Sequence, residues 1–259
     1  MNLFDILKEP DQSKFLQNIP AEVKPKLIFQ GVGGSHLYGL DWKGSDLDWR
    51  IIYQTTNPIY VYGLRENKTY CGTSEEEDFA SYELRHFMRL MAKSNTQVAE
   101  MMFCDDEHII HCDKTFRTIR ENKYKLLDTD CLYNSLRGYL HNERRLALGE
   151  RSGQLGGKRK ADIDERGYSH KNVVQFIRLC EVGRGLFEGG TYSVSMKNSY
   201  LYPLLMKIKT QPDEFSKEEV AILLDEYENL FMIGYTNRKF NFSFDYDLAG
   251  DILKNAYGK

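Results

Sequence analysis

The stretch Gly-Gly-Ser at residues 33–35, followed after ten intervening residues by Asp-Leu-Asp at 46–48, connects two apolar runs of the chain. The first run predicts a short strand over residues 26–31. The glycines after it allow a tight turn and a close approach of the backbone to a ligand. Ser35 offers a hydroxyl and a backbone N–H where the next turn starts, so it can cap a helix, contact a phosphate, or do both.

Asp46 and Asp48 belong to a run, residues 45–53, that alternates as a strand does. Side chains two residues apart on a strand point to the same face, so the two carboxylates are expected side by side. They repel each other unless a cation lies between them, and Mg²⁺ prefers oxygen ligands and substrate phosphates. The alternative is a pair of turn aspartates after Gly44. It fits less well, because apolar residues continue the run as a strand.

With this spacing, Gly-Ser and Asp-x-Asp resemble the signature of the DNA polymerase β-type nucleotidyltransferases. A longer set of motifs resembles the branch of that superfamily found in bacterial and phage RNA repair. These motifs are Gly34–Leu40, Ser45–Arg50, Tyr82–Phe87 with Asn95, Glu100–Phe103, His170-Lys171, Ile177–Leu179 and Gly189-Gly190. They spread over roughly residues 26 to 190, about two thirds of the chain.

The resemblance implies transfer of a nucleoside monophosphate from a triphosphate such as ATP to a hydroxyl group. Two Mg²⁺ ions, for which Mn²⁺ can substitute, would be held by Asp46, Asp48 and a third carboxylate on a neighbouring strand. The RNA-repair branch further implies template-independent addition to the 3′ end of an RNA such as tRNA. The expected partners are therefore a nucleoside triphosphate and an RNA acceptor.

The third carboxylate is expected to be Asp78, with Glu83 as the alternative. Asp78 shares strand parity with Ala80 and Tyr82, whereas Glu83 lies where a helix is expected to start. The acidic residues just before Asp78, at 75–77, are better explained as a solvated turn.

Phosphate contacts are expected from Gly34 and Ser35, and from two basic residues farther along the chain. Lys171 and Arg178 are seven residues apart, which places them on one face of a helix about two turns from each other. They would hold the β- and γ-phosphates or the RNA backbone. A basic, solvated helix face explains the same spacing equally well. Arg50 follows the carboxylates on the same strand face, where pairing with one of them is the simplest expectation.

The composition is that of an ordinary soluble protein, with 41% hydrophobic and 28% charged residues over 259 positions. No apolar run approaches the ~18–20 residues that span a bilayer, and the N-terminus does not resemble a signal peptide. The five cysteines are scattered, which favours a reducing cytoplasm. A net charge of −3 argues against non-specific coating of nucleic acid, but residues 151–171 form a local basic patch.

The expected fold is α+β: a small mixed sheet with flanking helices over residues 1–113, then a helical module over 114–259, with the active-site cleft between them. Strands are expected at 26–31, 45–54, 58–63 and 77–82. Helices are expected at 83–90, 96–103, 115–121, 130–148, 170–188 and 216–233, after a helical lead-in at 1–24. Residues 151–158, rich in glycine and basic residues, predict a mobile loop.

Two other functional readings start from the same motifs. The same chemistry can place a nucleotide on a protein hydroxyl, as in toxin–antitoxin systems, or on a small molecule. A catalytically silent nucleotide- or RNA-binding module is the reading from a different class, although all the expected carboxylates are present. An ATPase P-loop is excluded, because no lysine follows the glycines at the required spacing.

Overall fold

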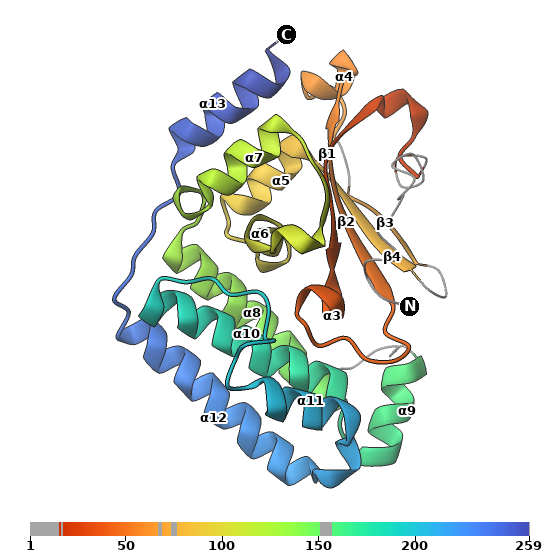
Figure 1. Ribbon diagram of the computed structural model, residues 1–259, viewed down its shortest axis with the longest axis vertical. Coiled ribbons are helices and arrows are strands. Elements are labelled where there is room, and N and C mark those ends of the chain that lie inside the picture. Colours follow the sequence, from red (N-terminus) through yellow and green to blue (C-terminus); the bar gives the residue numbers. More distant parts are fainter. Residues whose placement is uncertain (1–15, 17, 67–68, 74–76, 151–156, 259) are drawn as a thin grey trace. The chain divides into compact units, whose positions relative to one another are not determined.

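A computed structural model describes residues 16, 18–66, 69–73, 77–150 and 157–258 (Figure 1). The chain forms two compact units. The sheet unit comprises Met1–Asp128 and Ser243–Lys259, and the helical unit comprises Thr129–Phe242. None of the helices in the described ranges combines the length and the hydropathy that a bilayer span requires.

Within the described residues, five strands form one mixed sheet in the order β3-β4-β2-β1-β5. The strands are β1 (Pro25–Gly33), β2 (Leu47–Thr55), β3 (Tyr70–Thr73), β4 (Glu77–Glu83) and β5 (Ile109–Cys112). β2 and β4 run parallel, and the other neighbouring pairs are antiparallel. The register places Asp48 of β2 opposite both Gly33 of β1 and Asp78 of β4. The glycine turn and two of the predicted carboxylates therefore lie at the same end of the central strands.

The helices α5 (Leu84–Met91), α6 (Thr96–Phe103) and α7 (Lys114–Glu121) lie on one side of the sheet (Figure 1). Aromatic side chains hold α5 and α7 against the sheet. The ring of Phe116 on α7 lies 4.3 Å from that of Phe29 on β1 and 5.8 Å from that of Phe87 on α5, measured between ring centroids. All three side chains are fully buried, so this cluster fixes the helices against the sheet.

The last helix, α13 (Tyr246–Tyr257), returns to the sheet unit, where it contacts α5 and α7. Its C-terminal turn is tied to the end of the sheet opposite Asp48. The Gln54 side-chain N–H donates to the Ala256 carbonyl at 2.7 Å, and the Tyr257 hydroxyl donates to the Glu83 carboxylate. These two bonds join residues far apart in the sequence and hold the chain terminus against β2 and β4.

The helical unit consists of α8 (Thr129–Ala147), α9 (Gly157–Arg166), α10 (His170–Gly189), α11 (Tyr202–Thr210) and α12 (Lys217–Thr236). α10 is its central helix and packs against α8, α11 and α12. Gly183 makes the close approach possible, because a Cβ there would lie 2.6 Å from the Phe231 ring and 2.9 Å from Leu136. A capping box starts α12 as the sequence predicts, with Ser216 and Glu219 bonding each other's backbone N–H.

The α+β class and the mixed sheet are confirmed, but some predicted elements are wrong. Residues 58–63 do not form a strand. Instead, Asn57 accepts the Ile59 N–H and Pro58 occupies the first turn of a short helix, α4 (Pro58–Val61). The four-residue strands β3 and β5 and the helices α9, α11 and α13 were not expected. The two strands are too short to show a hydrophobic periodicity. The lead-in at 1–24 lies mostly outside the described residues, as does the predicted loop up to residue 156.

The division into units differs from the boundary expected after residue 113. Residues 114–128 and 243–259 both belong with the sheet. The physical reasons are the burial of Phe116 against Phe29 and the bonds that α13 makes to Gln54 and Glu83. Such contacts between distant parts of the chain leave no mark on the local hydrophobic pattern.

Candidate active site

The turn between β1 and the short helix α3 (Gly34–Leu37) requires glycine at position 34. Gly34 has a φ of +61°, which side chains rarely adopt. A Cβ at this position would also lie 1.6 Å from an Asp48 carboxylate oxygen, an impossible contact. The turn therefore brings a bare stretch of backbone directly against the Asp48 carboxylate. The close approach to a ligand stays a prediction.

Three predicted acidic residues lie at this end of the sheet unit. Asp48 and Asp78 are register partners on the parallel strands β2 and β4, which places their backbones about 4.8 Å apart, the usual spacing of paired strands. Asp46 directly precedes β2 and is not part of it. Asp46, Asp48 and Asp78 are all partly exposed, so a ligand can reach them.

A closed turn before Asp46 explains why the strand begins later than the alternation predicts. The Ser45 N–H donates to the Trp42 carbonyl at 2.8 Å, and the Ser45 hydroxyl accepts the Trp42 N–H at 2.9 Å. Gly44, with a φ of +85°, completes the turn. The paired strand therefore begins at Leu47, one residue after Asp46.

Arg50 pairs with Asp48, as expected for two residues on one strand face. The guanidinium nitrogen lies 3.6 Å from the Asp48 carboxylate, and another nitrogen of the same group donates to the Trp49 carbonyl at 3.1 Å. Gly33 makes room for this arginine, since a Cβ there would lie 2.9 Å from the Arg50 side chain. One cation of the protein thus offsets part of the negative charge of the site.

Glu83, the alternative third carboxylate, is committed to structural bonds. Its side chain is 1% exposed and accepts the backbone N–H groups of Arg85 and His86 at 3.0 and 3.3 Å, which caps α5. It also accepts the Tyr257 hydroxyl. Burial, together with the Glu83 charge, raises the pKa of that tyrosine. Glu83 lies opposite Tyr53, at the far end of β4 from Asp78.

The candidate carboxylates do not form a closed metal cage. Among the described residues, no three His, Cys, Asp or Glu side chains come together as a ready set of metal ligands. Mg²⁺ does not need such a set, because it is usually held by one or two carboxylates together with substrate phosphates and waters. Two in-register carboxylates beside an exposed glycine turn are compatible with this mode of binding.

A protein-family model named RNA repair pathway DNA polymerase beta family (RlaP) matches residues 8–155, which include this turn and all three aspartates. The chain belongs to this family. No curated protein matches the chain. Membership in the RNA repair pathway DNA polymerase beta family confirms the resemblance that the motifs predict, and it indicates a nucleotidyltransferase of an RNA repair pathway.

Two of the motifs that carry the family resemblance contact each other through their side chains. The Tyr38 hydroxyl, one residue after α3, donates to the Glu100 carboxylate on α6 at 2.8 Å. Glu100 is buried, with 6% exposure. Tyr82 is buried as well, and this burial raises the pKa of its hydroxyl. Our sequence analysis assigned no role to Tyr38 or Glu100, although both lie in the motifs that carry the resemblance. Their bond fixes α3, and with it the turn that presents Gly34 and Ser35.

Ser35 occupies the second position of α3 and does not cap it. The residue before the helix is Gly33, which has no side chain, so the first turn lacks a side-chain cap. Ser35 is partly exposed, and its carbonyl accepts the Leu40 N–H at 2.9 Å. The N–H groups of this first turn have no acceptor within the helix, as at the start of any helix.

The basic residues of the helical unit differ from the expected patch. Lys171 is exposed on α10, whereas Arg178 is completely buried in the same helix and donates to Gln175 at 3.1 Å. A basic, solvated face therefore does not describe this pair. Arg166 is neutralised by Asp162, Glu165 and Asp213, at 2.9, 2.9 and 2.6 Å. Both Lys171 and Arg178 lie beyond the residues that the family model matches.

Proposed function

We propose that the protein is a metal-dependent nucleotidyltransferase that adds a nucleoside monophosphate from a triphosphate to the 3′ hydroxyl of an RNA such as tRNA. The observation that supports this best is the register of Asp48 with Asp78, directly beside the backbone of Gly34. It combines oxygen ligands for a cation with a turn that lets a phosphate approach. Family membership supports the RNA-repair setting.

Asp46, Asp48 and Asp78 are the residues that would hold two Mg²⁺ ions, or Mn²⁺ in their place. Their donor set consists of carboxylate oxygens, which suits a hard cation. When bound, such ions lower the pKa of an attacking hydroxyl and stabilise the leaving pyrophosphate. Arg50 holds part of the charge of Asp48, and we propose that it balances this carboxylate before the ligands arrive.

Gly34 and Ser35 would bind the triphosphate of the nucleotide. A side chain at position 34 would occupy the space beside Asp48, so glycine keeps the phosphate path open. Ser35 would donate its hydroxyl, and the first-turn N–H groups of α3 would add donors that favour an anion. Tyr38 and Glu100 act indirectly, because their bond positions α3.

Lys171 is the proposed contact to phosphates from the helical unit, because its ammonium group is exposed and makes no ion pair with any described residue. The sequence predicts Arg178 as a second phosphate contact. We propose that it instead positions α10, because it is fully buried in that helix. A contact of Lys171 to the RNA backbone would weaken as salt is raised, since phosphate contacts release counterions.

The test is transfer from each of the four α-³²P-labelled triphosphates into total RNA and total protein with Mg²⁺. The control is the Asp46→Ala/Asp48→Ala double variant. Label in small RNA that is lost in the variant would support the proposal and identify the nucleotide. Label in protein would move the enzyme to the protein-modifying class. No label in either fraction, with Mg²⁺ or Mn²⁺, would contradict transfer to RNA.

A further inference from the structure

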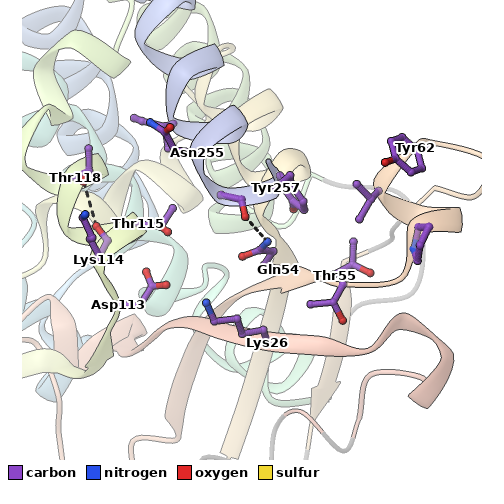
Figure 2. Close-up of a pocket in the computed structure, with 15 residues that line it drawn as sticks. Lys26, Gln54, Thr55, Tyr62, Asp113, Lys114, Thr115, Thr118, Asn255 and Tyr257 are labelled. Atoms are coloured by element: carbon purple, nitrogen blue, oxygen red, sulfur yellow. Dashed lines mark hydrogen bonds between the residues drawn. The ribbon is translucent and has the colours of Figure 1, made fainter. Parts of the chain in front are cut away.

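A cavity of about 760 Å³ opens in the sheet unit at the end of β1 and β2 opposite the aspartates. Its lining includes Lys26 near the start of β1 and Thr55 at the end of β2 (Figure 2). Thr55 lies seven residues beyond Asp48 on one strand, which corresponds to roughly 23 Å at ~3.3 Å per residue. The cavity is therefore separate from the candidate active site.

Internal hydrogen bonds fix the walls of this cavity. The Gln54 side chain donates to the Ala256 carbonyl at 2.7 Å, and the Thr118 hydroxyl donates to the Lys114 carbonyl at 3.1 Å, both drawn as dashed lines in Figure 2. Tyr257, another lining residue, is bonded to Glu83. The cavity is thus preformed, and its volume lies in the range of ~300–1,000 Å³ typical of small-ligand sites.

The charge of the lining favours an anion. Lys26 and Lys114 come from different elements, β1 and α7, and both line the cavity. Neither lysine makes an ion pair with another residue in the described part of the chain. Asp113 is the one carboxylate among the lining residues, and it accepts the Phe116 N–H at 3.0 Å as the cap of α7. Two ammonium groups therefore face one carboxylate that is already hydrogen-bonded.

We propose that this cavity is a second binding site, which takes the phosphate group of a nucleotide. Lysine, threonine and asparagine side chains supply the usual contacts to phosphate and sugar oxygens, and the lining offers Thr115 and Asn255 beside the lysines. Tyr62 lies at the same cavity with 81% of its surface exposed, which leaves its ring available for stacking on a base. The phosphate comes from a free nucleotide or from the backbone of RNA.

The test is a titration of the full-length, ¹⁵N-labelled protein followed through its backbone amide signals. The probes are inorganic phosphate, AMP and an oligoribonucleotide of about eight residues, a length within the ~4–16 nucleotides that single-strand binding sites cover. The signals of Thr115 and Asn255 report on the cavity, and those of Ser35 and Asp48 report on the candidate active site. The two sites, and the two proposals, are thus read separately.

We expect the Thr115 and Asn255 signals to shift. Lys26→Glu and Lys114→Glu should each weaken binding there by at least about tenfold, because each removes one charge-assisted hydrogen bond and adds a carboxylate that repels the phosphate. The matched control is Lys93→Glu, which reverses an exposed lysine of the same unit outside the cavity. It should leave the affinity unchanged. Because the two variants lie on different elements, misfolding of one of them still leaves the other as a test.

The source of the phosphate follows from the three probes. Shifts with AMP that exceed those with RNA assign the cavity to a free nucleotide. Tighter binding of RNA, lost steeply as salt is raised, assigns it to the RNA backbone. The proposal is overturned if no probe shifts Thr115 or Asn255, or if Lys26→Glu and Lys114→Glu bind as tightly as Lys93→Glu.

Discussion

The two ends of the parallel β2–β4 pair use carboxylates in opposite ways. At one end, Asp48 and Asp78 lie in register and are partly exposed, with Arg50 nearby. At the other end, Glu83 is buried and is hydrogen-bonded to two backbone N–H groups and to Tyr257. A carboxylate whose bonds are filled by the protein stabilises the fold, and one that stays accessible can bind a ligand. We propose on this basis that one end serves stability and the other serves chemistry.

The largest expected effect is loss of transfer on changing the accessible end. Asp48→Ala should lower the rate of nucleotide transfer by on the order of 10³-fold, comparable with removing a strong charge-stabilising group. The fold should remain, because a partly exposed carboxylate that repels its neighbour is removed. Label transfer and thermal unfolding measure the two effects. A strongly destabilised variant would contradict a purely functional role for Asp48.

Gly34→Ala should also abolish transfer, because its methyl group would collide with the Asp48 carboxylate. The matched control is Gly44→Ala. Gly44 also has a positive φ, but a Cβ there would meet no atom within 4 Å. Backbone strain, of about 1–3 kcal/mol, should be common to both variants. Label transfer that falls equally in both variants would show that strain alone, rather than the contact with Asp48, explains the loss.

A substitution at Glu83, the buried end of the β2–β4 pair, should lower the stability of the fold. Glu83→Ala should lower the free energy of unfolding by about 2–4 kcal/mol, since it removes a helix cap and leaves the partly buried Tyr257 hydroxyl without its acceptor. Urea denaturation measures this loss. A Glu83→Ala protein that unfolds like the wild type would remove the contrast between the two ends.

Alkaline pH should weaken the hydrogen bond between Tyr257 and Glu83. The folded protein raises the pKa of Tyr257 above its ordinary value of 10.0, through burial and then the charge of Glu83. The unfolded chain loses this proton first, so the stability contributed is present below about pH 10 and falls as the pH rises further. Tyr257→Phe should flatten this part of the stability curve. An unchanged slope in this variant would contradict the assignment.

Arg50→Gln should have the smallest effect on stability, below about 1 kcal/mol, because partly exposed ion pairs contribute little. Removing the cation leaves the charge of Asp48 free, so the Mg²⁺ concentration for half-maximal transfer should fall. A Mg²⁺ titration of the variant beside the wild type measures it. A higher Mg²⁺ requirement would instead indicate that Arg50 contacts the triphosphate.

Much of the candidate site could be predicted because its signals are local. The glycine turn, the aspartates at 46 and 48 and the capping box of α12 each depend on residues close in the sequence. The position of Glu83 at a helix start could be predicted, but its bond to Tyr257 could not, because that partner lies 174 residues away. The burial of Arg178 was equally hidden, since helical spacing shows which residues share a face but not what covers that face. The cavity beside Lys26 and Lys114 also forms only in the fold.

The most direct test of the account compares Asp78→Ala with Glu83→Gln in the label-transfer assay, with each rate expressed per folded protein. The two residues lie near opposite ends of the same strand, so the pair isolates which end carries the chemistry. We predict that Asp78→Ala loses transfer, while Glu83→Gln retains it with reduced stability. Retained transfer in Asp78→Ala together with its loss in folded Glu83→Gln would contradict the central claim.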